Sequence, residues 1–253
     1  MAKNVIGSLC MDKTLLRKLV ELHLPIADTG GIKIHENGIN ISTRTEGNYA
    51  IVTINVAEED LHNLKIDTDV LFGVNFVDIK ELIKGFGEPV CLDVFADRVK
   101  VTGGKYKTTL SIIPPSNIDN RVKARKFNLD NAVTVNISEL VKFLEVAKKF
   151  GEDLHVELTE DTLLFYVDDK GRHEFEYTRD DAEVWEFKEP AKAMYGITFL
   201  TDYLKAAKKY SVGDHVTIMM SDGYPIVVQF SIADVSFAEY CLAPRVRTDD
   251  EEE

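Results

Sequence analysis

The sequence lacks any run of eighteen consecutive apolar residues, which a membrane-spanning helix needs, so we expect no membrane partner. The first residues, MAKNVIGSLC, also lack the apolar stretch of a secretion signal, and we expect the chain not to be secreted. Cysteine is scarce. Cys10, Cys91 and Cys241 are odd in number and far apart, a pattern that fits neither a disulfide framework nor a zinc site and suits a reducing cytosol. We expect Cys10 and Cys91 to be small, buried apolar residues.

Motifs that carry catalysis or cofactor chemistry are also missing. The sequence contains no phosphate-binding loop, no glycine-rich dinucleotide turn and no His-x-x-x-His metal pair. The acidic clusters at 58–60 and 168–169 resemble loop charges rather than general acid–base pairs. The six histidines are scattered singly, at His23, His35, His62, His155, His173 and His215. We therefore expect a protein that is not an enzyme and that has no cofactor and no metal site.

The chain does have the composition of a folded protein and a large acidic excess. With 45% apolar and aromatic residues among 253, it can bury the core of one large domain or of two ordinary ones. Its formal charge of −13 would ordinarily argue against nucleic acid as a ligand. The charge is uneven, however: the segments 12–22, 78–86, 138–150 and 200–210 hold eleven Lys or Arg and seven Asp or Glu. These four segments carry +4, and the remainder carries −17.

The four basic segments resemble one another. VKFLEVAKKFG at 141–151 aligns with TDYLKAAKKYS at 201–211, sixty positions later. FVDIKELIKGFG at 76–87 and KTLLRKLVELH at 13–23 are further relatives, so the helices recur at steps of about 60 to 66 residues. Recurrence at such a spacing predicts a duplicated architecture.

Between the helices the apolar residues alternate with period two, as in β-strands. GIKIHENGINI at 31–41 has an Asn-Gly turn signal between two short strands. Further strands are expected at 49–56, 90–101, 110–113, 154–158, 163–167, 173–177, 216–220 and 226–232. We predict an α+β fold in which a β-α-β-β-β unit is used four times.

Two such units make a domain, and two domains make the chain. Two prolines, Pro114 and Pro115, end a strand and cannot lie in the centre of a sheet, so they indicate the start of a linker. The predicted organisation is an N-terminal domain at 1–115, a connector at 116–128, a C-terminal domain at 129–247 and an acidic tail at 248–253.

Each helix has an apolar face and a basic face. At 100° per residue, Lys205 and Lys209 lie opposite Leu200 and Leu204, and the other three helices repeat the arrangement. The apolar faces are expected to pack on a sheet. A lysine face on one helix is ordinarily only solvated, but its recurrence on all four helices of an acidic protein indicates an electrostatic function.

The segment GYPIVVQFSIADVSFAEYCLAPRV at 223–246 resembles the C-terminal strands of the proliferating cell nuclear antigen (PCNA) family, the ring-shaped DNA sliding clamps of eukaryotes and archaea. GVNF at 73–76 and GINI at 38–41 resemble the same family, and so do the length, the duplication and the acidic balance. The resemblance implies two clamp domains per chain and a ring of three chains around double-stranded DNA, with the helices on the inner face of the sheets.

The resemblance implies that the basic helix faces line the DNA channel and contact phosphates without reading sequence. Asp202 stands where relatives often have a basic residue. The expected channel residues are Lys13, Arg17, Lys18, Lys80, Lys84, Lys142, Lys148, Lys149, Lys205, Lys208 and Lys209.

The ring also requires head-to-tail contacts between subunits. In this family an edge strand of the first domain pairs with an edge strand of the second domain of the neighbouring subunit. The corresponding segments here are about 105–113 and 172–179. The expected interface residues are Lys105, Lys107, Thr109, Ser111, Arg172, Glu174, Glu176 and Thr178. A homotrimer and a heterotrimer of paralogues are both compatible with the sequence.

Partner proteins of the family insert short peptides, with a glutamine, an aliphatic residue and paired aromatics, into a pocket between the connector and the C-terminus. The matching positions are Arg44, Ile118, Pro225, Tyr240, Cys241, Leu242, Ala243, Pro244 and Val246. The chain departs from the family in three places: Arg44 and Thr45 replace a Met-Asp pair, Cys241 replaces an aromatic residue, and the connector carries basic residues at Arg121, Lys123, Arg125 and Lys126.

The resemblance implies a non-enzymatic processivity factor for DNA replication and repair. Its partners are double-stranded DNA, DNA polymerase, flap endonuclease, DNA ligase and a clamp loader, in the cytoplasm of an archaeal-type cell or in a eukaryotic nucleus. Two alternatives stay open at this point. One is a subunit of a damage-checkpoint clamp with the same fold, and the other is a hydrolase built on a duplicated α+β scaffold.

Overall fold

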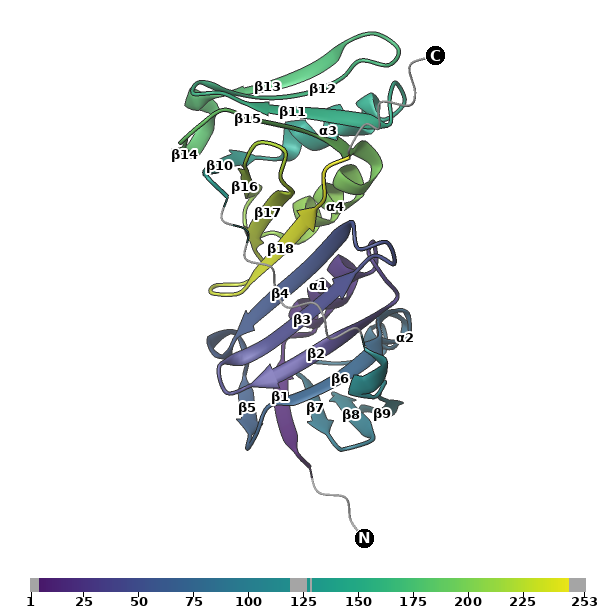
Figure 1. Ribbon diagram of the computed structural model, residues 1–253. Coiled ribbons are helices and arrows are strands. Elements are labelled where there is room, and N and C mark those ends of the chain that lie inside the picture. Colours follow the sequence, from purple (N-terminus) through teal and green to yellow (C-terminus); the bar gives the residue numbers. More distant parts are fainter. Residues whose placement is uncertain (1–4, 119–126, 128, 246–253) are drawn as a thin grey trace. The chain divides into compact units, whose positions relative to one another are not determined.

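The structure is a computed structural model that describes residues 5–118, 127 and 129–245. In this part of the chain the residues form two compact units, which are traced in Figure 1. The residues up to 118 together with 231–239 make up the first unit. The second unit comprises the described residues from 127 to 230 together with 240–245.

The first unit is built from strands β1 to β9 and helices α1 and α2. In chain order these are β1 (Gly7–Met11), α1 (Lys13–His23), β2 (Thr29–His35), β3 (Gly38–Arg44), β4 (Ala50–Ala57), β5 (Asn63–Ile66), β6 (Val70–Asn75), α2 (Phe76–Ile83), β7 (Val90–Val94), β8 (Arg98–Gly103) and β9 (Tyr106–Ser111).

The second unit repeats this order of elements. It contains β10 (Asn131–Asn136), α3 (Ser138–Ala147), β11 (Asp153–Leu158), β12 (Thr162–Val167), β13 (His173–Thr178), β14 (Ala182–Glu186), β15 (Ala191–Gly196), α4 (Ile197–Tyr210), β16 (His215–Met220) and β17 (Ile226–Ser231). The last strand, β18 (Phe237–Leu242), contributes residues to both units.

The strands of the two units also pair in the same way. The first unit has one sheet in the order β5-β1-β7-β8-β9 and another in the order β4-β3-β2-β6. The corresponding orders in the second unit are β14-β10-β16-β17 and β13-β12-β11-β15. The predicted α+β fold of repeated helix-and-strand units is therefore confirmed. Each unit has one strand more than two β-α-β-β-β repeats require, β5 or β14, whose sequences NLKI and AEVWE are too short to show a clear period.

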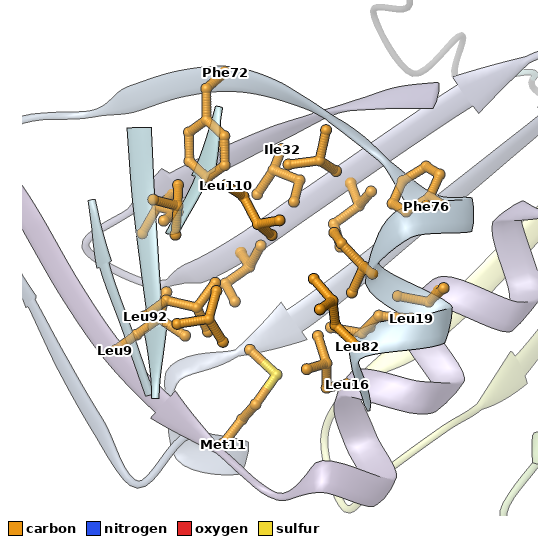
Figure 2. A pocket seen from close by; sticks show the side chains of 18 of the residues that line it. Leu9, Met11, Leu16, Leu19, Ile32, Phe72, Phe76, Leu82, Leu92 and Leu110 are labelled. Carbon is orange, nitrogen blue, oxygen red and sulfur yellow. The ribbon is translucent and has the colours of Figure 1, made fainter. Parts of the chain in front are cut away.

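The core of the first unit lies between its two sheets and its two helices. Figure 2 shows Leu9 from β1, Leu16 from α1, Ile32 from β2, Phe72 from β6 and Phe76 from α2 around one small space. This cavity has a volume of about 40 Å³, and all of the side chains that line it are apolar. Apolar cavities stay dry, so we interpret the space as a gap in the packing of the core rather than as a binding site.

The helices pack in pairs, α1 on α2 and α3 on α4, with their apolar faces buried. Helix α2 begins at Phe76 because the Asn75 side chain accepts hydrogen bonds from the amides of Val77 at 2.9 Å and Asp78 at 3.3 Å. The predicted apolar faces of α1 and α4 are confirmed by the burial of Leu19 and Leu204. Among the described residues, no helix is long and apolar enough to cross a membrane.

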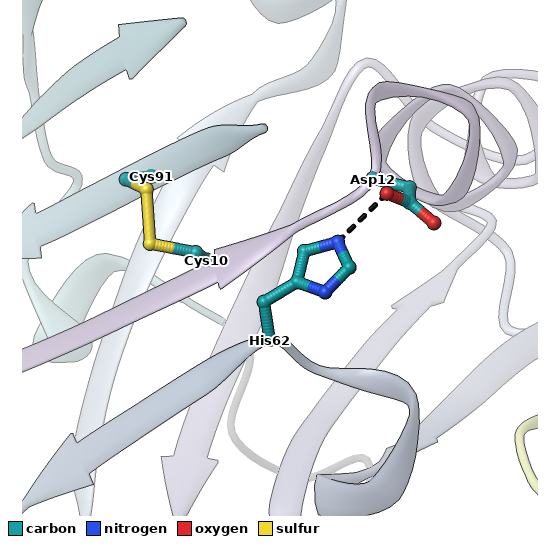
Figure 3. Close-up of a disulfide and its surroundings, with 4 residues drawn as sticks. All are labelled: Cys10, Asp12, His62 and Cys91. Atoms are coloured by element: carbon teal, nitrogen blue, oxygen red, sulfur yellow. Dashed lines mark hydrogen bonds and ion pairs between the residues drawn. A yellow bond between two sulfur atoms is a disulfide. The ribbon is translucent and has the colours of Figure 1, made fainter. Parts of the chain in front are cut away.

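The prediction that Cys10 and Cys91 are buried free thiols is wrong. The two residues form a disulfide, which Figure 3 shows between β1 and β7. They lie directly opposite each other in the antiparallel pair and are half-exposed. The two cysteines are 81 positions apart in the sequence, so sequence inspection did not identify the pair; only the register of β1 on β7 brings them together. Cys241 forms no disulfide in the described part of the chain.

Candidate functional site

In the first unit the exposed polar faces of α1 and α2 carry most of the predicted channel cations. Arg17, Lys80 and Lys84 are exposed. The Lys84 ammonium lies 2.5 Å from the Glu81 carboxylate, one helical turn away. Exposed pairs of this kind are weak, so Lys84 can exchange this carboxylate for a phosphate at little cost.

Lys13 and Lys18 are held more tightly than the other cations of this unit. The Lys13 ammonium donates to the Phe86 carbonyl at 2.6 Å, and the Lys18 ammonium donates to the Ile232 carbonyl at 2.5 Å. Burial lowers the pKa of Lys18 below its ordinary value. Lys18 thus faces the 231–239 segment, and among the predicted channel residues of this unit it is the least suited to contact an external anion.

In the second unit α3 and α4 are joined by an ion pair across the helix interface. The Lys205 ammonium lies 2.7 Å from the Glu145 carboxylate. The hydrogen bond between them lowers the pKa of Glu145 and raises that of Lys205. Lys142 pairs with Glu139 of its own helix at 3.2 Å.

The remaining cations of α3 and α4 gather towards the ends of the two helices. Lys148, Lys149 and Lys209 are exposed and Lys208 is half-exposed. The Lys209 ammonium lies over the Tyr210 ring, 4.6 Å from its centroid. Flexible cations on helices are suited to phosphate contacts that carry no sequence information.

Strands β9 and β13 are the edges of their sheets that the sequence predicted as subunit contacts. In the described part of the chain, β9 pairs only with β8 and β13 pairs only with β12. All eight predicted interface residues are exposed: Lys105, Lys107, Thr109, Ser111, Arg172, Glu174, Glu176 and Thr178. The β9 edge is basic, and β13 carries two carboxylates, so the two edges are complementary in charge.

The inner side of β13 is anchored by aromatic packing. Phe175 stacks on Phe143 of α3 at 5.7 Å between ring centroids. The Tyr177 hydroxyl donates to the Asn136 carbonyl at 2.5 Å, and burial raises the pKa of Tyr177. An edge strand held in this way presents its free backbone groups in a fixed geometry, which favours pairing with another strand.

The first unit also contains a polar cavity of about 320 Å³ on the outer face of β2 and β3. It brings together two of the predicted pocket residues, Arg44 and Ile118. The other lining residues are mostly small or polar: Ala27, Thr29, Gly30, Gly31, Ser42, Thr43, Thr45, Glu46, Ile113 and Asn117. The sequence predicted an apolar pocket between the connector and the C-terminus, and that pocket stays a prediction; the cavity within the first unit is polar.

Two glycines make room for this cavity. Ile113 and Gly73 exchange backbone hydrogen bonds of 2.8 and 2.9 Å, which holds the residues after β9 against the edge of β6. A Cβ on Gly73 would come within 2.9 Å of the side chains of Ile113 and Ile118, and one on Gly31 within 3.0 Å of Ile118. Any larger side chain at either glycine would therefore push Ile118 away from the sheet.

The other predicted pocket residues belong to the second unit. Tyr240 and Leu242 are buried, and Tyr240 stacks on Tyr203 at 4.0 Å. These two side chains are core residues, so they can support a docking surface but not form it. Half-exposed positions are Pro225, Cys241, Ala243 and Pro244. Val246 and the basic connector residues Arg121, Lys123, Arg125 and Lys126 lie outside the described residues.

The second unit has no equivalent of the polar cavity at the corresponding place. In the first unit, Ser42, Gly31 and Gly73 lie side by side across β3, β2 and β6. The matching row in the second unit, across β12, β11 and β15, is Tyr166, His155 and Met194. His155 stacks on Tyr166 at 4.6 Å, and the Arg172 guanidinium lies 4.2 Å from the centre of the Tyr166 ring. Large side chains thus fill the space that the glycines leave open.

Sequence inspection missed this cavity, although a signal was present. Glycine inside a strand pattern indicates a close approach of other backbone or side chains, and Gly30, Gly31 and Gly73 all interrupt apolar strands. Among the residues that the structure describes, no cluster of three or more His, Cys, Asp or Glu side chains could hold a metal ion.

Comparison with known proteins identifies relatives along the whole chain. Residues 123–245 match the family model of the proliferating cell nuclear antigen C-terminal domain. A protein named DNA polymerase sliding clamp from Methanothrix thermoacetophila is 24% identical over 242 residues, which is 93% of this chain and 97% of the relative. The proliferating cell nuclear antigen of Dictyostelium discoideum is 20% identical over 256 residues, with 93% and 97% covered.

Solved structures share the fold. The PCNA of A. fulgidus, solved with the C-terminal region of FEN-1 bound, has a TM-score of 0.85 at 20% identity and covers 96% of this chain and 100% of its own. The PCNA of Thermococcus kodakaraensis has a TM-score of 0.81 at 16% identity, with 94% and 100% covered. The clamp fold expected from the resemblance is confirmed.

Proposed function

We propose that this chain, which belongs to the proliferating cell nuclear antigen family, is a DNA polymerase sliding clamp that encircles double-stranded DNA. The observation that carries the proposal is the recurrence of one lysine-bearing helix in four equivalent places of an acidic chain. In the proposed organisation, two clamp domains at 1–115 and 129–247 are joined by a connector at 116–128, and an acidic tail follows at 248–253.

The helix lysines contact phosphates, which are the same at every base pair, so the clamp can move along DNA. Retention on DNA comes from enclosure rather than from affinity, and weak, exchangeable contacts are therefore sufficient. The acidic remainder of the chain repels DNA from other surfaces. We propose no catalytic role and no cofactor for the chain itself. A clamp-loading ATPase opens the ring. The ring acts on DNA in the cytoplasm of an archaeal-type cell or in a nucleus.

Changing Lys84, Lys149 and Lys209 together to Glu is expected to abolish stimulation of a DNA polymerase on primed template, a loss of at least about tenfold. Each substitution replaces an attraction to phosphate with a repulsion, and all three side chains are exposed, so the fold does not depend on them. Primer-extension assays with loaded clamp measure the effect. The matched control changes three exposed lysines outside the helices to Glu, which reverses the same number of charges: Lys65, Lys170 and Lys192. Unchanged polymerase stimulation by the helix variant would contradict the assignment of these lysines to the DNA channel.

For the ring we propose that β9 of one subunit pairs with β13 of the next, as a head-to-tail contact. Light scattering after size exclusion is expected to give a trimer, alone or with sister subunits. Lys107→Glu is expected to weaken the assembly about fivefold or more, because like charges then face each other across the edge. Combining it with Glu174→Lys and Glu176→Lys restores opposite charges and part of the affinity. Monomers under all conditions, sister subunits included, would exclude the ring.

We propose that the clamp tethers DNA polymerase, flap endonuclease and DNA ligase through peptides that dock near the polar cavity of the first unit. The A. fulgidus PCNA, which binds the C-terminal region of FEN-1, supports this assignment. Gly73→Met is expected to weaken the binding of such a peptide at least tenfold, because the added side chain displaces Ile113 and Ile118, which line the cavity, and so changes its shape. Fluorescence anisotropy measures the affinity, and a melting curve checks that the variant folds. The control is Met194→Leu at the matching place in the second unit, and equal affinities for both variants would contradict the assignment.

A further inference from the structure

The Cys10–Cys91 disulfide lies on the outer face of the sheet β5-β1-β7-β8-β9. Along β1 the side chains of Leu9 and Met11 point into the core, and that of Cys10 points the other way. On β7 the ends of the strand, Val90 and Val94, are buried, and Cys91 lies between them on the outer face. Because both cysteines are half-exposed, a small molecule in solution can approach the sulfur atoms.

The face around the disulfide is basic. Register places Lys65 beside Ser8 on one side of the cysteines and Lys100 beside Asp93 on the other. Lys107 lies next to Thr102, which is itself opposite Cys91. Lys65, Lys100 and Lys107 are exposed, whereas Asp93 is the one carboxylate among the outward positions of these five described strands.

Two further groups near the disulfide are charged or titratable. Figure 3 shows the His62 imidazole next to the end of β1, where its Nε2 lies 2.7 Å from the Asp12 carboxylate. Both side chains of this pair are exposed. Arg98, on the same outward face, lies 3.5 Å from Asp97. The lysines around the cysteines are therefore not neutralised by a matching number of carboxylates.

The basic face is a property of the first unit alone. The corresponding sheet of the second unit consists of β14, β10, β16, β17 and the end of β18, with the strand sequences AEVWE, NAVTVN, HVTIMM, IVVQFS and FAEYCL. These five strands contain neither lysine nor arginine, and their single cysteine, Cys241, forms no disulfide in the described part of the chain. In a chain with a formal charge of −13, the lysines and the disulfide thus occur together on one of two equivalent sheets.

We propose that Cys10 and Cys91 form a thiol–disulfide exchange site for anionic low-molecular-weight thiols. The reacting species is a thiolate, and a thiol that also carries a carboxylate approaches with one more negative charge than a neutral thiol does. Lys65, Lys100 and Lys107 together with Asp93 leave a net charge of +2 on this face, which at about 10 Å in water attracts the extra charge enough to raise the rate about fourfold at low salt. The site is independent of the proposed clamp function.

The reaction proceeds in two balanced steps. The external thiolate attacks one of the two sulfurs, forms a mixed disulfide with it and releases the other cysteine as a thiolate, which takes a proton from water. A second external thiolate then attacks the sulfur of the first external thiol in the mixed disulfide. It releases the remaining protein cysteine as a thiolate, which also takes up a proton. The protein disulfide is reduced to two thiols, and two external thiols are oxidised to one disulfide.

The experiment compares reduction of the oxidised full-length chain by 3-mercaptopropionate and by 2-mercaptoethanol, with each rate expressed per thiolate. Alkylation of the freed thiols, followed by mass spectrometry of the peptides, counts Cys10 and Cys91 separately from Cys241. We expect the ratio of the two rates to be about four at low salt and to approach one at 0.5 M salt, where screening is strong.

Replacing Lys65 and Lys100 by Ser is expected to bring the ratio to about one at low salt. The matched control, Lys170→Ser with Lys192→Ser, removes two exposed lysines of the second unit and is expected to leave the ratio near four. If the ratio of the two reduction rates is the same in the wild type and in the variant with Lys65 and Lys100 replaced by Ser, the proposal is overturned. It is also overturned by the absence of a peptide linked through Cys10 and Cys91 in the air-oxidised chain, whichever way the clamp assays turn out.

Discussion

Replacing both Cys10 and Cys91 by Ser is expected to lower the free energy of unfolding of the first unit by about 4.5 kcal/mol. The disulfide closes a loop of 81 residues, and in the chain-entropy description a cross-link over this distance restricts the unfolded chain by that amount. Since stabilities of whole domains are of the order of 5 to 15 kcal/mol, the loss is a large part of the total. Urea unfolding of the oxidised chain and of the variant measures it.

Reduction offers an independent check of the same quantity. Adding dithiothreitol to the wild-type chain should remove as much stability as the double substitution does, and it should have no effect on the double variant. Cys241→Ser is the control, because Cys241 forms no disulfide in the described part of the chain and closes no loop. If the oxidised wild type and the double variant unfold at the same urea concentration, the disulfide does not stabilise the unit.

Acidification is expected to destabilise the first unit through His23, by about 5 kcal/mol between pH 6.5 and pH 3. His23 is completely buried, and burial lowers the pKa of its imidazole from 6.5 to about 3. The ring stacks on Phe76 at 5.0 Å, and its Nδ1 lies 2.8 Å from the Thr43 hydroxyl. The Nε2 atom has no hydrogen-bond partner among the described residues, so nothing in the fold stabilises the protonated ring.

The sign follows from the lowered pKa. Below pH 6.5 the unfolded chain binds a proton at His23 that the folded chain does not bind until about pH 3, so protons favour unfolding in this range. The stability associated with the neutral ring is fully present above pH 6.5 and is lost as the pH falls towards 3. Urea unfolding at a series of pH values gives the slope.

His23→Phe is the variant that isolates this effect. It keeps an aromatic ring against Phe76 and removes the titrating group, so its stability should vary less with pH than that of the wild type. At pH 7 the variant is expected to lose about 1 to 3 kcal/mol, because the buried Thr43 hydroxyl loses its partner, and adding Thr43→Val should recover part of the loss. An identical pH dependence in wild type and His23→Phe would show that His23 is not the group that senses acid.

Several parts of the architecture could be predicted from local sequence. The helices α3 and α4 were recognisable because Leu144 and Leu204 recur in matching apolar patterns, and periodicity alone determines which face of a helix is buried. The edge strand β13 was recognisable from its alternation of exposed and inward residues, whereas alternation predicted a strand only at 110–113 and missed most of β9. The lysine faces followed from the same periodicity.

Other features depend on which segments meet. Cys10 and Cys91 are ordinary half-exposed strand residues until β1 pairs with β7 in one register. The family resemblance implied that Lys18 lines the DNA channel, and in the structure its ammonium donates to the Ile232 carbonyl, 214 residues away along the chain. Contacts between residues so far apart in sequence leave no periodic trace, because the pairing of strands and loops is decided only when the whole unit folds.

The sequence by itself determined the duplicated α+β plan and the basic helix faces in an acidic chain, since both rest on patterns that repeat along the chain. Only the tertiary structure decided the contrast between the two equivalent outer sheet faces. Gly31 and Gly73 become neighbours across β2 and β6 and leave a cavity, whereas His155 and Met194 become neighbours across β11 and β15 and fill the same space. The physical reason is that the volume at a site is the sum of side chains from several strands, and no single stretch of sequence contains that sum.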